Sequence, residues 1–383
     1  MMRIAYVCTD PGIPVFGAKG ASIHVQEMLR AFLHLGAEAV LISPRLDDDG
    51  SADLDPVRRL RLAPSPKGDP EVRERALLEQ NAAVRAALDA AGPFDLVYER
   101  HALFGHGAME WAAERRIPAV LEVNAPLIEE QSRHRTLALP DAARDSARRA
   151  LGAASLVTAV SPQVARYVQD FGAQRVEVIP NAVNPDRFPT VPRPRGPFTV
   201  GFLGTLKPWH DVRTLIEAFA ILREGTVPDA RLLIVGDGPE RQFLEDRLDA
   251  LGLTGAASFP GAVTAAEVPG CLARMHTAVA PYAGGQAFYF SPLKIYEYMA
   301  AGLPVVASRV GHLEEVIDPG TGLLCPPDDA GALADALARL AADPDLRARL
   351  GDAARADVLA HHTWDGVARR VLASAGLAAK DAA

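Results

Sequence analysis

The chain has 383 residues and a net charge of −8 at pH 7. This length is enough for two domains of ordinary size, and a hydrophobic content of 49% excludes a disordered chain. The acidic balance gives no overall attraction for nucleic acid or for an anionic membrane. No apolar run approaches the length of a transmembrane helix. We therefore expect a globular protein without a transmembrane segment, for which peripheral contact with a membrane stays open.

The three cysteines, Cys8, Cys271 and Cys325, lie far apart and show no metal-ligand spacing. An odd number of scattered cysteines favours buried free thiols in a reducing compartment. The N-terminal apolar run is interrupted too early, at residues 10–12, to be a signal peptide. These observations predict a cytoplasmic protein.

Apolar runs alternate with segments of helical period along the whole chain. In the first half the predicted strands are residues 3–7, 39–42, 96–98, 119–123, 156–159 and 176–179, and the first predicted helix is residues 22–35. In the second half the predicted strands are residues 198–203, 232–235, 257–259, 277–280 and 305–307, and the predicted helices are residues 211–222, 241–251 and 364–377. This alternation predicts an α/β fold with mostly parallel sheets.

Five prolines between residues 184 and 197 indicate a stiff connector, after which the strand–helix pattern restarts. We therefore predict two Rossmann-like, doubly wound domains that face a central cleft. Their expected bounds are residues 1–190 and 191–362, with a C-terminal helix at residues 363–383 that packs back on the first domain. Ligands of such sheets bind at the carboxyl ends of the strands.

Residues 288–308, FYFSPLKIYEYMAAGLPVVAS, are the most informative segment. They run from a polar loop into a short helical pattern that begins near Lys294 and Glu297. A helix start offers free N–H groups and a partial positive charge, which bind anions. The lysine adds a full charge, and the glutamate can accept from sugar hydroxyls. These parts can hold a nucleotide-sugar diphosphate; an amphipathic helix with solvated charges is the alternative.

Two further loops can approach a ligand. Gly17 and Gly20 precede the first helix and allow close backbone approach to a phosphate or a sugar, although an ordinary strand-to-helix turn has the same pattern. His24, in the first turn of that helix, is an acceptor contact or a packing histidine. Lys207 follows the first strand of the second domain, where it can neutralise a diphosphate leaving group or remain a surface lysine. Glu315 is a site acid or a helix-start glutamate.

Polar residues also end two strands of the first domain. Glu99, His101, Glu122 and Asn124 are candidates for the acceptor side by position alone. The sequence shows no metal-ligand cluster, no nucleophile elbow and no aromatic-basic stripe for nucleic acid. We therefore expect neither a metal nor a cofactor nor a nucleic-acid partner.

Taken together, these segments resemble the family 4 glycosyltransferases, which are retaining enzymes of the GT-B fold. The resemblance covers nearly the whole chain and depends on the order and spacing of short segments. These are residues 17–27, 157–161, 178–183, 201–204, 215–218, 235–239 and 297–307.

The resemblance implies transfer of a sugar, with retention and without a metal, from a nucleoside-diphosphate sugar to a hydroxyl acceptor. The donor is then a co-substrate, and the acceptor is a glycan, a lipid-linked molecule or a small molecule. The implied catalytic residues are Lys207, Lys294 and Asn124. The implied donor-binding residues are Gly17, Gly20, Gly204, Gly236, Tyr289, Ser291, Pro292, Leu293, Glu297 and Glu315.

The chain departs from the family pattern at several positions. The family commonly carries two glutamates eight residues apart; Glu297 matches the second, implied to bind ribose, and Tyr289 stands at the first. Thr205 and His210 hold the positions of an arginine and a lysine, and Asn124 holds that of the usual cleft histidine. Lys207 and Lys294 would supply the missing charge. The Ser-Pro-Leu-Lys sequence before Glu297 matches a recurring subgroup, so we interpret these departures as substitutions.

Two alternatives stay open from the sequence. A GT-B sugar-nucleotide epimerase would need acid/base carboxylates, for which Glu99 and Glu122 are the candidates. A catalytically silent nucleotide-sugar-binding protein would account for the departures from the family pattern. The acceptor is undetermined, and the small basic patch at residues 133–135 would meet an anionic acceptor or form a solvated helix face.

Overall fold

The computed structural model describes residues 1–46, 52–189, 193–285 and 288–377, which divide into two compact units. Unit 1 contains Met1–Asn181, Tyr289–Ser291 and the segment that begins at Trp364. Unit 2 contains Ala182–Phe288 and Pro292–Thr363.

The division falls before the proline-rich connector, whereas the sequence pattern places it after residue 190. Phe188 explains the difference, because its side chain is 1% exposed and its carbonyl oxygen accepts a hydrogen bond from Arg355 Nη1 at 2.8 Å. Both residues belong to unit 2. The first part of the connector is therefore packed onto unit 2.

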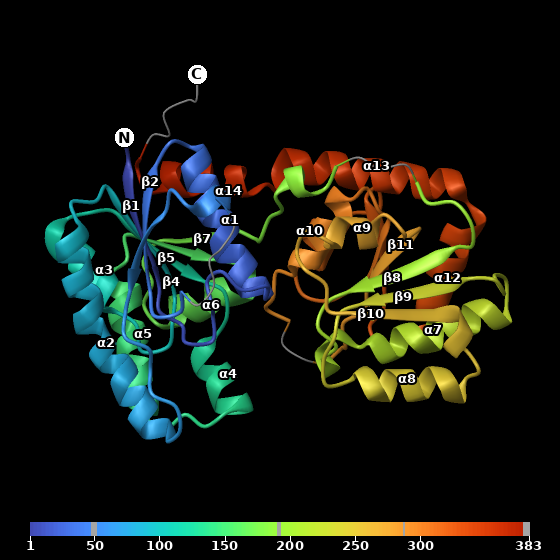
Figure 1. The fold of residues 1–383 in the computed structure, drawn as a ribbon, viewed down its shortest axis with the longest axis horizontal. Coiled ribbons are helices and arrows are strands. Elements are labelled where there is room, and N and C mark those ends of the chain that lie inside the picture. The colour runs from blue at the N-terminus through green and yellow to red at the C-terminus, as the bar shows by residue number, and fades with distance from the viewer. Residues whose placement is uncertain (47–51, 190–192, 286–287, 378–383) are drawn as a thin grey trace. The chain divides into compact units, whose positions relative to one another are not determined.

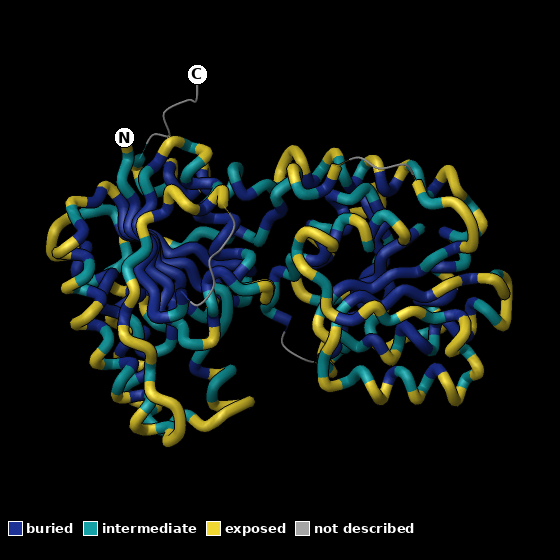
Figure 2. Tube along the Cα trace, viewed as in Figure 1, coloured by how far each residue is buried: buried dark blue, intermediate teal, exposed yellow. Residues whose placement is uncertain are grey.

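Unit 1 is built on a seven-stranded parallel sheet in the order β3-β2-β1-β4-β5-β6-β7 (Figure 1). Its strands are β1 (Arg3–Cys8), β2 (Glu38–Ser43), β3 (Arg58–Arg61), β4 (Leu96–Arg100), β5 (Ala119–Val123), β6 (Leu156–Ala159) and β7 (Val176–Val178). Most of its strands are buried along their length, as expected of a parallel sheet with helices on both faces (Figure 2).

The helices of unit 1 cover both faces of this sheet. They are α1 (Gly20–His34), α2 (Pro70–Ala91), α3 (Gly107–Arg115), α4 (Leu127–His134), α5 (Pro140–Ala153), α6 (Pro162–Asp170) and α14 (Trp364–Ser374), with a 3-10 turn η1 (Ala52–Leu54). Leu88 of α2, Trp111 of α3 and Leu151 of α5 share one core with the strands. The C-terminal helix α14 packs against α1.

Unit 2 repeats the plan with a six-stranded parallel sheet in the order β10-β9-β8-β11-β12-β13 (Figure 1). Its strands are β8 (Thr199–Leu203), β9 (Arg231–Val235), β10 (Ala257–Gly261), β11 (Thr277–Ala280), β12 (Val305–Ser308) and β13 (Gly322–Cys325). Its helices are α7 (Val212–Glu224), α8 (Arg241–Ala250), α9 (Val268–Leu272), α10 (Leu293–Ala300), α11 (Leu313–Val316), α12 (Ala330–Ala342) and α13 (Pro344–His361), with 3-10 turns η2 (Pro185–Arg187), η3 (Pro208–His210) and η4 (Thr254–Ala256).

The predicted α/β class and the two doubly wound sheets are confirmed, but the sequence pattern missed two edge strands, β3 and β13, and several helices, among them α2. β3 is an edge strand with a single apolar residue, so it lacks the buried run that marks the other strands. α2 was missed although the sequence contains a signal for its start. Asp69 caps the helix by accepting from Val72 N at 3.1 Å, and Pro70 follows at the first helical position. The missed strand β13 has four residues and lies at an edge of the sheet of unit 2.

In both sheets the strand order reverses beside the first strand, between β1 and β4 and between β8 and β11. The loops at the carboxyl ends of these strands are the usual ligand-binding positions in such folds. Most of the polar residues selected from the sequence follow these and neighbouring strands.

Candidate functional site

The loops after β8 and β9 are in direct backbone contact. Gly204 N donates to Val235 O at 2.9 Å. The φ angles of Gly204 and Gly236 are +145° and +137°, and a Cβ on Gly236 would lie 1.9 Å from Gly204 O. A Cβ on Gly238 would lie 2.4 Å from Leu206 O. Close packing of the two loops therefore requires glycine at these positions, whether or not a ligand is bound.

Lys294, in the first turn of α10, is buried against these loops. Its residue is 9% exposed, and its Nζ lies 4.1 Å from the ring centroid of Phe202 and 5.6 Å from that of Tyr282. A Cβ on Gly204 would lie 2.7 Å from Nζ. Within the described residues Nζ has no hydrogen-bond partner. Burial lowers the pKa of this amine to about 7, and the charge of Glu297 only partly opposes that effect.

Aromatic rings and one neutral imidazole, that of His210, lie near this amine. The ring of His210 lies 5.7 Å from that of Tyr282 and 6.0 Å from that of Phe202. Burial, with a smaller effect of Lys294, lowers the pKa of His210 to about 3. His312 lies farther along, with its ring 6.4 Å from that of Phe288, which in turn contacts Tyr282. It is 2% exposed, neither ring nitrogen has a partner in the described part of the chain, and burial lowers its pKa to about 4. The amine is therefore surrounded by ring faces, and the one carboxylate among the described residues whose charge is shown to act on it, Glu297, is itself paired with Arg187.

The other predicted residues of unit 2 lie in different surroundings. Glu297 forms an ion pair with Arg187 of η2, with Nη1 and Oε1 3.5 Å apart. Lys207 is half-buried, and its Nζ lies 5.7 Å from the ring centroid of Trp209. Glu315 is exposed on the short helix α11. The structure thus brings Lys294, Gly204 and Gly236 together.

The loop before α10 is divided between the units. Tyr289 and Ser291 belong to unit 1, where the Tyr289 hydroxyl donates to a carboxylate oxygen of Glu130 in α4. Ser291 Oγ accepts from Asn181 N at 2.9 Å. Pro292 caps α10 and Leu293 begins it, both half-buried. Tyr289, at the position of the family's first glutamate, therefore has a carboxylate partner rather than being a carboxylate.

In unit 1, a buried carboxylate joins three of the predicted acceptor-side residues. Glu122 Oε1 lies 2.9 Å from His24 Nε2 and accepts from Arg100 Nη1 at 2.7 Å. The Tyr98 hydroxyl and Asn124 Nδ2 also donate to this carboxylate. All four partners lie around a group that is 3% exposed. Sequence reasoning found His24, Glu122 and Asn124 but missed the two partners on β4.

Charge compensation keeps Glu122 ionised. Burial raises the pKa of Glu122, but His24, Arg100 and the Tyr98 hydrogen bond outweigh it and lower this pKa to about 2. Burial lowers the pKa of His24, which favours its neutral form. Arg100 is therefore the partner that keeps a positive charge beside Glu122. An ionised carboxylate with four partners is a structural anchor of the strand ends.

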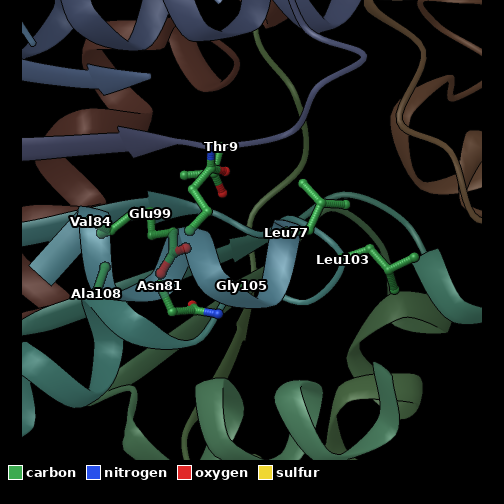
Figure 3. A pocket seen from close by; sticks show the side chains of 9 residues that line it. Thr9, Leu77, Asn81, Val84, Glu99, Leu103, Gly105 and Ala108 are labelled. Carbon is green, nitrogen blue, oxygen red and sulfur yellow. The ribbon is translucent and has the colours of Figure 1, made fainter. Parts of the chain in front are cut away.

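Glu99 lies apart from this network, although it precedes Arg100 in the chain. Its Oε2 has no partner among the described residues, and burial raises its pKa to about 8. It borders a small cavity between β4, α2 and α3 (Figure 3). The cavity is lined by Thr9, Leu77, Gln80, Asn81, Val84, Glu99, Leu103, Gly105 and Ala108. Glu99 is therefore a neutral acid at pH 7, and the neighbouring His101 is buried with a pKa lowered to about 4.

The glycine loop after β1 is held by its own helix. Gly17 O and Val15 O each accept from Gln26 Nε2 at 2.9 Å. Gly20 is the exposed first residue of α1. The ligand contact expected of Gly17 and Gly20 stays a prediction, and the structure shows that Gln26 holds the loop by these two hydrogen bonds.

Neither metal-binding nor membrane-spanning features occur in residues 1–46, 52–189, 193–285 and 288–377. No three His, Cys, Asp or Glu side chains there are grouped so as to hold a metal ion. No helix in these ranges is both long enough and apolar enough to cross a bilayer. The thiols of Cys8 and Cys325 are buried and free, whereas Cys271 is free but only half-buried, because α9 is a short surface helix.

The Glu122 network predicts a specific acid response. Since the pKa of Glu122 is lower in the folded chain than its ordinary value of 4.5, its stabilising contribution is present above pH 4.5 and is lost as the pH falls toward 2. The contribution is on the order of 3 kcal/mol. Urea unfolding between pH 3 and 6 should show a smaller loss of stability in Glu122→Gln than in the parent chain. The exposed Glu71→Gln serves as the control, and equal slopes for all three proteins would contradict the assignment.

Two family models match successive parts of the chain. Residues 18–187 match the model described as Glycosyltransferase Family 4, and residues 197–343 match the model described as Glycosyl transferases group 1. The phosphatidyl-myo-inositol mannosyltransferase of Mycobacterium leprae is 36% identical over 221 residues, which cover 56% of this chain and 57% of that protein. The GDP-mannose-dependent alpha-(1-6)-phosphatidylinositol monomannoside mannosyltransferase of Mycobacterium tuberculosis is 30% identical over 245 residues, covering 60% and 63%. The chain thus spans less than two thirds of the length of these curated relatives.

The fold has relatives among solved structures. Sucrose-phosphate synthase from Thermosynechococcus elongatus superimposes with a TM-score of 0.75 at 23% identity, covering 97% of both chains. This similarity establishes the fold, which is that of the GT-B glycosyltransferases with their two parallel α/β domains. The two matched models lie in the same order as the two sheets. The chain therefore belongs to the family 4 glycosyltransferases, with the N-terminal and C-terminal domains that these two models describe.

Proposed function

We propose that the protein is a retaining glycosyltransferase that moves a sugar from a nucleoside-diphosphate sugar to a hydroxyl acceptor without a bound metal. The observation that carries this proposal is the buried amine of Lys294, without a polar partner in the described chain, at the start of α10. A buried cationic group without a partner is costly unless an anion completes its surroundings. A diphosphate is an anion that suits a helix start with a lysine.

In this proposal the protein acts mainly by positioning and by stabilising charge. The bond between the anomeric carbon and the diphosphate oxygen breaks, and the acceptor oxygen forms the new bond on the same face. The departing diphosphate oxygen takes the acceptor's proton. Lys294 and the N–H groups at the start of α10 would stabilise the charge on that oxygen, and Glu297 would accept from ribose hydroxyls.

The names of the relatives suggest which substrates to try first. One is a phosphatidyl-myo-inositol mannosyltransferase, and another is described as dependent on GDP-mannose. We therefore propose GDP-mannose as the first donor to test and a lipid-linked hydroxyl as the first acceptor. The basic residues at the end of α4, Arg133 and His134, would favour an anionic acceptor. The free thiols are consistent with a cytoplasmic location, which we also propose.

A donor must stabilise the folded chain if it binds. We expect GDP-mannose, or UDP-glucose if the site prefers the other base, to raise the melting temperature; a hundredfold excess over Kd adds about 2.7 kcal/mol. The measurement is a thermal-shift series, with mannose 1-phosphate as a control that lacks the nucleotide. If no GDP- or UDP-sugar shifts the transition, the proposal fails.

Stereochemistry is tested separately with the donor that binds. Slow hydrolysis of an α-linked donor should first release the α-anomer of the sugar, observed by NMR before it equilibrates. Initial release of the β-anomer would contradict retention. Donor binding with no hydrolysis and no transfer would favour the silent binding protein.

The carboxylates give the epimerase alternative little support. Glu122 is held ionised by four partners, and Glu99 is a neutral acid in a separate cavity. Arg100 and Glu122 are paired in the register of β4 and β5, so Glu99 points to the opposite face of the sheet. An acid/base pair would need the two groups in one place. Formation of epimerised sugar nucleotide without an acceptor would reverse this choice.

A further inference from the structure

We propose that binding of the nucleotide-sugar is coupled to the uptake of a proton by Lys294, so that affinity for the donor falls as the pH rises. This inference rests on the proposed function and adds a regulatory property to the same site. The proton comes from solvent and remains on the amine, and no bond of the donor changes.

The geometry makes the ammonium form unfavourable in the absence of a ligand. Nζ lies 4.1 Å above the centroid of Phe202 and 5.6 Å from that of Tyr282, and no hydrogen bond to it occurs in the described chain. Attraction to ring faces does not replace the water that the amine has lost. The position at Gly204 has no room for a side chain beside Nζ, since a Cβ would lie 2.7 Å from it.

The titratable groups around the amine cannot supply the missing charge. Glu297, one turn along α10, is paired with Arg187 at 3.5 Å. His210, from η3, is neutral because burial and Lys294 lower its pKa to about 3. The hydroxyls of Tyr282 and Tyr298, from the β11 end and from α10 itself, have pKa values raised by burial. The amine is therefore poised between its neutral and charged forms, with a pKa of about 7.

A diphosphate would change this balance. An oxyanion within about 4 Å favours the ammonium form, and such partners raise the pKa of a buried amine by one to several units. At pH 6 the amine already carries its proton, so binding of the donor should take up only about 0.1 proton. At pH 8 the free site is mostly neutral, so binding should take up about 0.9 proton. The apparent Kd should increase roughly eightfold between pH 6.5 and pH 8.

Calorimetry tests the coupling with the intact chain. GDP-mannose, or UDP-glucose if it binds more tightly, is titrated at pH 6 in MES and in Bis-Tris buffer and at pH 8 in HEPES and in Tris buffer, because phosphate would compete for the proposed anion site. Both phosphates of these donors are diesters and do not titrate in this range. The dependence of the observed enthalpy on the ionisation enthalpy of the buffer gives the number of protons. Donor binding without uptake at pH 8 overturns this inference alone, whereas no binding of either donor overturns the proposed function as well.

Two kinds of variant assign the proton to its acceptor. Lys294→Arg keeps a permanent charge and Lys294→Met an unbranched chain of similar length, and both should bind without proton uptake. His210→Gln removes a neighbouring imidazole whose pKa Lys294 affects, and this variant should keep the full uptake of the parent chain. Uptake that survives in both Lys294 variants, or that disappears in His210→Gln, would overturn the assignment to Lys294.

Discussion

Replacing Gly236 with alanine is expected to lower the free energy of unfolding of unit 2 by about 3 kcal/mol or more. The φ angle of +137° is one that a residue with a Cβ rarely adopts, and the new Cβ would lie 1.9 Å from Gly204 O. Backbone strain and forced separation each cost about 1–3 kcal/mol. The atom that would have to move is a backbone oxygen, so no side-chain rotation relieves the contact. For a domain of this size the melting temperature should fall by about 6–12 °C.

Gly270→Ala is the matched control for Gly236→Ala. Gly270 lies inside α9, and a Cβ there would meet nothing within 4 Å. Alanine in a helix interior is favoured over glycine by about 0.5–1 kcal/mol, so this variant should be neutral or slightly more stable. Thermal unfolding followed by circular dichroism compares the two. Equal melting temperatures would mean that the loops after β8 and β9 can separate without cost.

Substitution of Lys294 by methionine is expected to change activity and stability in opposite directions. Loss of a buried charge that stabilises a leaving group should reduce turnover of the donor by roughly 100- to 1000-fold. The fold should become more stable, because a buried amine with no polar partner in the described chain is replaced by an apolar side chain of similar length.

The gain in stability should depend on pH with a defined sign. The pKa of Lys294 is about 7 in the folded chain against an ordinary value of 10.5. The penalty of burying the charge is thus fully present below pH 7 and disappears as the pH rises from 7 to 10.5. Urea unfolding of both proteins at pH 6.5 and pH 9 measures this difference.

Lys207→Met is the comparison for that experiment. Lys207 is half-buried with its Nζ over the ring of Trp209, so removal of its charge should leave the stability nearly unchanged. We expect its turnover to fall as well, by roughly tenfold, because solvent screens a half-buried charge. Unchanged turnover in both lysine variants would remove the electrostatic basis of the proposed function. A less stable Lys294→Met would show that the amine has a partner in the free protein.

Much of the fold follows from local pattern. Buried strands in parallel sheets are continuous apolar runs, and the strands predicted from such runs are those in the two sheets. β3 was not predicted, because an edge strand does not need a continuous apolar run. The donor-binding role of Gly204 and Gly236 stays a prediction, and the structure shows that their loops pack on one another.

The functional groups are harder to predict, because alternation along a strand decides which face a side chain takes but not which neighbour it meets. Tyr98 and Arg100 share a face by their spacing of two residues, and Glu99 must take the other. Tyr98 and Arg100 both contact Glu122 because the strand register pairs Arg100 with Glu122. No local sequence pattern contains that register.

By itself, the sequence determined the class of fold, the two sheets and the segments that carry the candidate chemistry, because these depend on short-range period and turn residues. Only the tertiary structure decided the charge and the contacts of each functional side chain. Tyr289 hydrogen-bonds to Glu130, which lies 159 positions away in the chain. The rings of Phe202 and Tyr282 bury the amine of Lys294 and exclude water from it. Burial and partner set the charge of a side chain, and both come from residues that are distant in sequence.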